Sequence, residues 1–94
     1  ISSTGDLLLI WNKNVDPGAS LGGKRTPLNV AISKDEGESW ILERELETDP
    51  NFSYSYPSLT FIRNRAVLTY WVEDSSKRQW STKFRSLPIS WFYR

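Results

Sequence analysis

The sequence predicts an all-β fold. Short runs of strand-forming residues recur along the 94 residues and are separated by clusters of turn residues, a pattern typical of sheets joined by tight turns. Aromatic residues make up 14% of the chain and include five tryptophans, which favour the pleated surface of a strand. Some runs are apolar on both faces and others on only one, so we expect both inner and outer strands.

The first part of the chain contains two expected strands and a long loop. Residues 5–11 form a turn followed by a continuous apolar run, which predicts a strand buried on both faces. Residues 12–26 are rich in proline and glycine and predict a loop, and connections of this length are more often functional than decorative. Residues 28–33 place leucine, valine and isoleucine on one face, as expected of a strand that returns from this loop.

A recognisable motif follows, with the pattern Ser33-x-Asp35-x-Gly37-x-x-Trp40. Aspartate and serine side chains hydrogen-bond to backbone groups a few residues on and so close a turn, while glycine accepts a positive φ. The motif therefore predicts a β-hairpin with a side-chain lock, after which Trp40 re-enters the core.

The strand expected over residues 40–47 is amphipathic. Its leucines alternate with acidic residues, and charges on an outer strand discourage pairing with other chains. We interpret the acidic side as a solvated face and not as a catalytic pair. The residues of this face are Glu43, Glu45 and Glu47.

The second half of the chain repeats this alternation of runs and turns. Proline is tolerated at the start of a strand, so Pro57 marks where one begins. The aromatic residues near the C-terminus are expected to pack as core. In order, the expected elements are a loop over 48–55, a strand over 56–62, a tight turn over 63–65, an apolar strand over 66–72, a turn over 73–78, a strand over 79–86 and an aromatic segment over 87–93.

The strands differ in character, since some are apolar on both faces and others on only one. A β-propeller has this arrangement, because the inner strands of each radial blade are buried and the outer strands are amphipathic. The sequence therefore predicts a β-propeller. In an up-and-down meander, every second connection lies at the same end of the strands. Arg25, at the end of the first loop, and Tyr56, after the loop over 48–55, are then neighbours. Asn12 lies at this end too and is a candidate for substrate contact, with turn formation as its alternative. The motif over residues 33–40 lies at the opposite end.

Composition excludes several classes of site. Twelve basic and eleven acidic residues give a net charge of +1, so no basic face for nucleic acid is expected. The absence of cysteine and histidine excludes disulfides, the usual zinc sites and Ser-His or Cys-His nucleophiles within the chain. No apolar run reaches the roughly 18 residues that a membrane-spanning helix needs. No metal or cofactor is expected.

The chain resembles sialidase-like BNR-repeat proteins. The resemblance rests on the run from Arg25 to Ser33, the motif over residues 33–40, which is the Asp-box of that family, and the run from Tyr54 to Thr60. It covers nearly the whole chain.

The resemblance implies that residues 1–94 are the C-terminal fragment of a single six-bladed propeller domain. A partial blade with the Asp-box would occupy residues 1–47, and the last blade would occupy residues 48–94. It also implies a retaining exo-sialidase, which removes terminal sialic acid or a related acidic sugar from glycans. The compartment stays open, with a secreted or periplasmic location suggested by the family.

The residues carried over from the family are an arginine and a tyrosine. Arg25 matches an arginine that clamps the substrate carboxylate, and Tyr56 matches the tyrosine nucleophile. A phenol approaches an anionic sugar without the charge repulsion that a carboxylate nucleophile meets. Tyr54 offers a competing register two residues earlier and is included as a substrate-binding candidate. The acid/base aspartate, the glutamate partner and two further arginines are expected in the part of the protein before this chain.

Two departures leave other functions open. The family motif has Ser or Thr after the tyrosine, where this chain has Pro57, and many members have a glutamate where this chain has Trp71. The alternatives are a propeller that binds or cleaves another acidic glycan, and a structural or interaction propeller without catalysis. The fragment alone is expected to be inactive.

Overall fold

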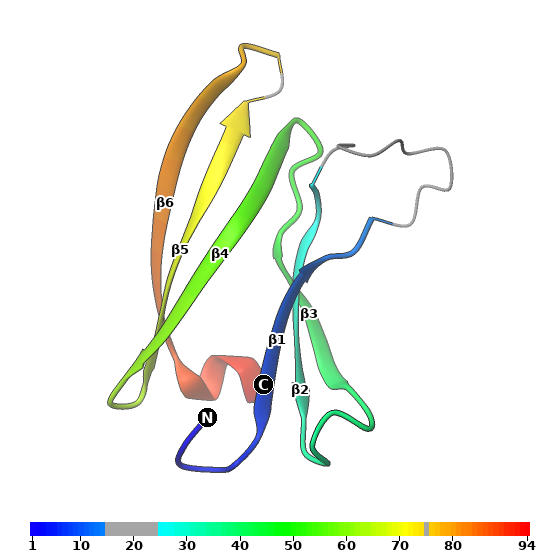
Figure 1. Cartoon of the computed structure of the whole chain (residues 1–94), viewed down its shortest axis with the longest axis vertical. Coiled ribbons are helices and arrows are strands. Elements are labelled where there is room, and N and C mark those ends of the chain that lie inside the picture. The colour runs from blue at the N-terminus through cyan, green and yellow to red at the C-terminus, as the bar shows by residue number, and fades with distance from the viewer. Residues whose placement is uncertain (15–24, 75) are drawn as a thin grey trace.

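The fold consists of two three-stranded antiparallel sheets, seen in a computed structural model that describes residues 1–14, 25–74 and 76–94. Strands pair in sequence order within each sheet, so each sheet is a simple meander. Figure 1 shows the two sheets lying beside one another. The first sheet contains β1 (Leu7–Asn12), β2 (Leu28–Ser33) and β3 (Ile41–Glu47), and the second contains β4 (Phe52–Ile62), β5 (Arg65–Asp74) and β6 (Gln79–Pro88). The all-β prediction is therefore confirmed.

The core lies between the two sheets. The middle strand of each sheet supplies most of it, because a middle strand is covered on both edges. Phe92 closes one end from the short 3-10 helix η1 (Ile89–Tyr93) and is 1% exposed, so the expected packing of the aromatic C-terminal segment is confirmed. The buried hydrophobic cluster consists of Leu28, Val30, Ile32, Leu46, Tyr54, Ala66, Leu68, Tyr70 and Phe92.

Two of the strand predictions were wrong about burial. The first strand exposes 44% of Leu7 and 37% of Leu9, and Trp71 in β5 is 50% exposed. In β1 and β5 one face packs against the shared core, and the side chains on the other face stay accessible in the described part of the chain. Trp40 is 42% exposed and lies across the turn near Gly37 instead of entering the core.

The fourth strand begins at Phe52, four residues before the predicted start at residue 56. The pairing of β4 with β5 is interrupted between Ser55 and Ser58, and a bulge of this kind accepts a proline that cannot donate to the ladder. Pro57 therefore sits inside a long strand and does not mark its beginning.

The acidic face predicted for β3 was wrong at Glu47. Bulges shift the pairing of β2 with β3, so that Glu47 lies opposite Leu28 and Arg44 lies opposite Val30. Each one-residue shift moves the following side chains to the other face of the sheet. The Glu47 side chain is consequently only 12% exposed, while Glu43 and Glu45 are exposed.

Candidate functional site

The candidate site lies where β1 ends, where β2 begins and where β4 passes both. Asn12, the last residue of β1, donates from its side-chain Nδ2 to the main-chain oxygens of Arg25 at 3.0 Å and Tyr54 at 3.1 Å. A longer contact of 3.4 Å reaches the oxygen of Pro27. One amide group thus ties three separate segments together, and its two hydrogens are directed at backbone and not at solvent.

The backbone of Arg25 runs along the edge of β4. Its carbonyl accepts a hydrogen bond from the Tyr54 amide at 2.8 Å, and its own amide donates to Ser53 Oγ at 3.2 Å. These bonds place Arg25 against the part of β4 that precedes the bulge. The greater part of the predicted loop, residues 15–24, lies outside the described residues.

Tyr56 lies in the bulge and is exposed. Its φ is +52°, a left-handed conformation that non-glycine residues adopt at an energetic cost and that is found preferentially at functional positions. The side chain is 69% exposed. The guanidinium carbon of Arg25 lies 5.1 Å from the centre of the Tyr56 ring, within the range of a cation–π contact.

Tyr54 has the opposite environment, although it is only two residues away. It is 4% exposed, and its ring meets the Tyr70 ring edge-on at 6.1 Å between centroids. Burial, with additional contributions from the charges of Glu47 and Asp49, raises the pKa of Tyr54 to about 12. Tyr54 is therefore harder to deprotonate than an exposed tyrosine.

Sequence reasoning missed a cluster of charged and polar side chains around Glu47. Tyr70 Oη donates to Glu47 Oε2, Lys83 Nζ donates to the same oxygen at 2.6 Å, and Arg85 lies 4.0 Å from it. Burial and then the bond to Glu47 raise the pKa of Tyr70. No local sequence pattern predicts this cluster, because its residues come from three strands. The inward position of Glu47 also depends on the register shifts between β2 and β3.

The Asp-box lies at the other end of the sheets. Ser33 Oγ accepts from the Gly37 amide at 2.8 Å, and Asp35 Oδ1 accepts from the Ser39 amide at 2.8 Å and from Ser33 Oγ at 2.9 Å. Gly37 has a φ of +90°. Hydrogen bonds, first of all the one from Ser39 Oγ, hold the pKa of Asp35 below its usual 3.8.

The two ends are separated by the length of the strands. The strand β2 runs from Leu28, near Arg25, to Ser33 in the Asp-box. The Asp-box and the Arg25–Tyr56 pair therefore lie at opposite ends of this strand. Figure 1 shows the β2–β3 hairpin at the end where η1 also lies. Of the sequence candidates, the structure thus brings together Asn12, Arg25, Tyr54 and Tyr56, and it keeps the Asp-box apart.

Within the described residues, no group of three or more acidic side chains is arranged to hold a metal ion. The same residues contain no helix with the length and apolar character needed to cross a membrane.

Comparison with known families gives one match. The family model for the BNR repeat-like domain matches residues 2–70, more than half of the chain. No curated protein and no solved structure matches the chain.

Proposed function

The chain belongs to the BNR repeat-like family, and on that premise we propose that it is part of a sialidase-like glycosidase. The enzyme removes terminal sialic acid, or a related acidic sugar, from glycans. The observation that carries the proposal is the contact of the Arg25 guanidinium with the exposed ring of Tyr56. A carboxylate-binding group and a potential nucleophile thereby stand beside one another at one end of the sheets.

In the proposed mechanism, Arg25 orients the substrate and Tyr56 attacks it. A guanidinium binds a carboxylate through two parallel hydrogen bonds, which a lysine cannot reproduce. Tyr56 Oη forms a bond to the anomeric carbon while the bond to the leaving oxygen breaks. The phenolic proton passes to a base, the leaving oxygen takes a proton from an acid, and water later releases the sugar.

One observation favours a second candidate, which is binding of an acidic glycan without cleavage. The chain has Pro57 after Tyr56, and it has Trp71 where many members of the family have a glutamate. The surroundings of Tyr56 therefore depart from those of the family's nucleophile. In this alternative Arg25 still binds the sugar carboxylate.

Hydrolysis of a fluorogenic sialoside by the full-length protein tests the nucleophile. We expect Tyr56→Phe to lower kcat at least about a hundredfold, because the attacking oxygen is lost while the ring remains. Tyr93→Phe is the control, since Tyr93 bonds to Asp6 near the Asp-box end and its loss should leave kcat unchanged. A kcat of Tyr56→Phe equal to that of the wild type would contradict the assignment of Tyr56 as the nucleophile.

Binding of free sialic acid tests the clamp separately. Arg25→Lys keeps the charge but loses the paired hydrogen bonds, so we expect about tenfold weaker binding. A wild-type protein that binds the sugar through Arg25 but does not hydrolyse the sialoside would establish the second candidate. Equal affinity in the wild type and Arg25→Lys would rule out the clamp in both.

A further inference from the structure

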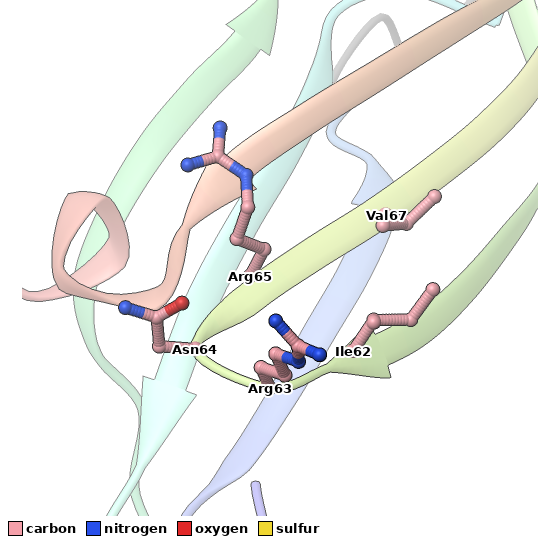
Figure 2. Close-up of a pocket in the computed structure, with 5 residues that line it drawn as sticks. All are labelled: Ile62, Arg63, Asn64, Arg65 and Val67. Carbon is pink, nitrogen blue, oxygen red and sulfur yellow. The ribbon is translucent and has the colours of Figure 1, made fainter.

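A concave site lies at the hairpin between β4 and β5, away from Arg25 and Tyr56. The hollow has a volume of about 410 Å³, which is within the lower range of small-molecule pockets. Figure 2 shows the five residues that line it, with Arg63 projecting from the turn and Arg65 projecting from the start of β5 toward β6. These residues are Ile62, Arg63, Asn64, Arg65 and Val67.

The hollow carries two positive charges without a counter-charge. Arg65 donates from Nε to Ser86 Oγ at 2.7 Å and from one terminal nitrogen to the Ser86 carbonyl at 3.0 Å, and both acceptors are uncharged. Among the described residues, no acidic side chain forms an ion pair with Arg63 or Arg65. An anion that entered the hollow would interact favourably with both positive charges.

One wall of the same hollow is apolar. Ile62 is 55% exposed, and Val67 lies on the adjacent strand, on the same face of the sheet. A fully hydrated inorganic ion would leave this apolar wall uncovered. Apolar surface beside a few convergent polar groups is typical of sites for small organic ligands.

The turn itself keeps an arginine where a glycine is favoured. Arg63 has a φ of +56° in a two-residue hairpin loop, a position at which glycine relieves the strain. Arg78 in the β5–β6 turn has a similar φ of +51°, but it does not line the hollow. Strain alone therefore does not mark a site, and Arg78 provides a matched control for Arg63.

We propose that this hollow binds an organic anion, in which a carboxylate, sulfate or phosphate group is attached to an apolar body. The guanidinium group of Arg63 binds the anionic group through paired hydrogen bonds. Arg65, which Ser86 holds through Nε and one terminal nitrogen, adds a second positive charge to the hollow. Ile62 and Val67 contact the apolar body. The site is independent of the proposed glycosidase function, since Arg25 and Tyr56 take no part in it.

Titration followed by NMR of the arginine Nε–Hε signals tests the site in the whole protein. The probes are benzoate, phenyl sulfate and phenyl phosphate, with inorganic phosphate and benzyl alcohol as partial ligands. We expect the Arg63 and Arg65 signals to shift, and at least one aromatic anion to bind about tenfold more tightly than either partial ligand. The ranking of the three anions identifies the preferred acidic group.

Two glycine variants separate binding from stability. Arg63→Gly should weaken binding about tenfold or more without lowering Tm, because glycine suits the positive φ. Arg78→Gly removes the same kind of strain at the other turn and should bind as the wild type does. If Arg63→Gly fails to fold, Arg63→Asn serves instead, since asparagine tolerates the left-handed conformation.

Three results would overturn the proposal. The first is equal affinity of the Arg63→Gly and Arg78→Gly variants. The second is binding of benzyl alcohol as tight as that of all three anions. The third is a shift of the Arg25 signal without a shift at Arg63 or Arg65.

Discussion

Asn12 shows how one side chain organises the candidate site. Its amide bonds to the backbone of Arg25 and Tyr54, the two segments that carry the guanidinium and the bulge with Tyr56. All of its contacts are with main-chain oxygens, so the donors of the amide are already used within the protein. We infer that Asn12 positions the site and does not contact the substrate directly.

Replacing Asn12 by aspartate tests this positioning role. The change keeps the shape but directs a carboxylate at two or three carbonyl oxygens, so we expect a loss of about 2–4 kcal/mol in unfolding free energy at neutral pH. Urea denaturation measures the loss. Acidification should restore part of the stability, because a protonated carboxyl can donate again. An Asn12→Asp variant as stable as the wild type at pH 7 would contradict the positioning role of Asn12.

The bond between Tyr70 and Glu47 offers a second prediction at the scale of the residue. Tyr70→Phe removes a hydrogen bond to a carboxylate in a buried setting, so we expect a loss of about 1.5–3 kcal/mol. Tyr56→Phe is the matched control, because its hydroxyl is exposed and the change should stay within about 0.5 kcal/mol. Equal effects of the two substitutions on urea denaturation would show that the Glu47 bond is not stabilising.

At the scale of the element, the Asp-box stabilises the β2–β3 hairpin through the ionised form of Asp35. Its carboxylate accepts hydrogen bonds from Ser39 and Ser33. The pKa of Asp35 is therefore lower in the folded chain than in the unfolded chain. The contribution of this group is present above the unfolded pKa and is lost as the pH falls through the folded pKa.

This linkage predicts how two variants behave on acidification. Asp35→Asn and Ser39→Ala should both be less stable than the wild type at pH 7. Their difference from the wild type should shrink as the pH falls from about 4, near the unfolded pKa, through the lower folded pKa of Asp35. Urea denaturation at a series of pH values from 7 to about 2.5 measures the difference. A difference that stays constant or grows toward low pH would contradict this account.

At the scale of the whole molecule, the two sheets are held together by a shared core that η1 closes. Phe92 is fully buried there, whereas Phe84 on the outer face of β6 is 64% exposed. We expect Phe92→Ala to cost about 3–5 kcal/mol because it leaves a cavity between the sheets. Phe84→Ala should change stability by only about 0.5 kcal/mol. Comparable losses in thermal unfolding would mean that η1 does not close the core.

The distance between the Arg25–Tyr56 pair and the Asp-box is also a property of the whole molecule. Strand parity predicted that Arg25 and Tyr56 lie together and that the Asp-box lies at the far end, and the described residues have this arrangement. The division of the chain at residues 47 and 48, and its place as the last part of a propeller, stay predictions.

The sequence by itself determined the all-β class, the bounds of β2 and, to within one residue, the tight turn at Arg63 and Asn64, because strand periodicity and turn chemistry are local properties. Only the tertiary structure decided which faces are buried. Alternation puts Tyr54 and Tyr56 on the same face, yet they are 4% and 69% exposed. Tyr56 lies in the bulge between Ser55 and Ser58, and this bulge changes the face of every residue that follows it. The same effect turns Glu47 inward, and such a shift depends on the partner strand and not on the residues of the strand itself.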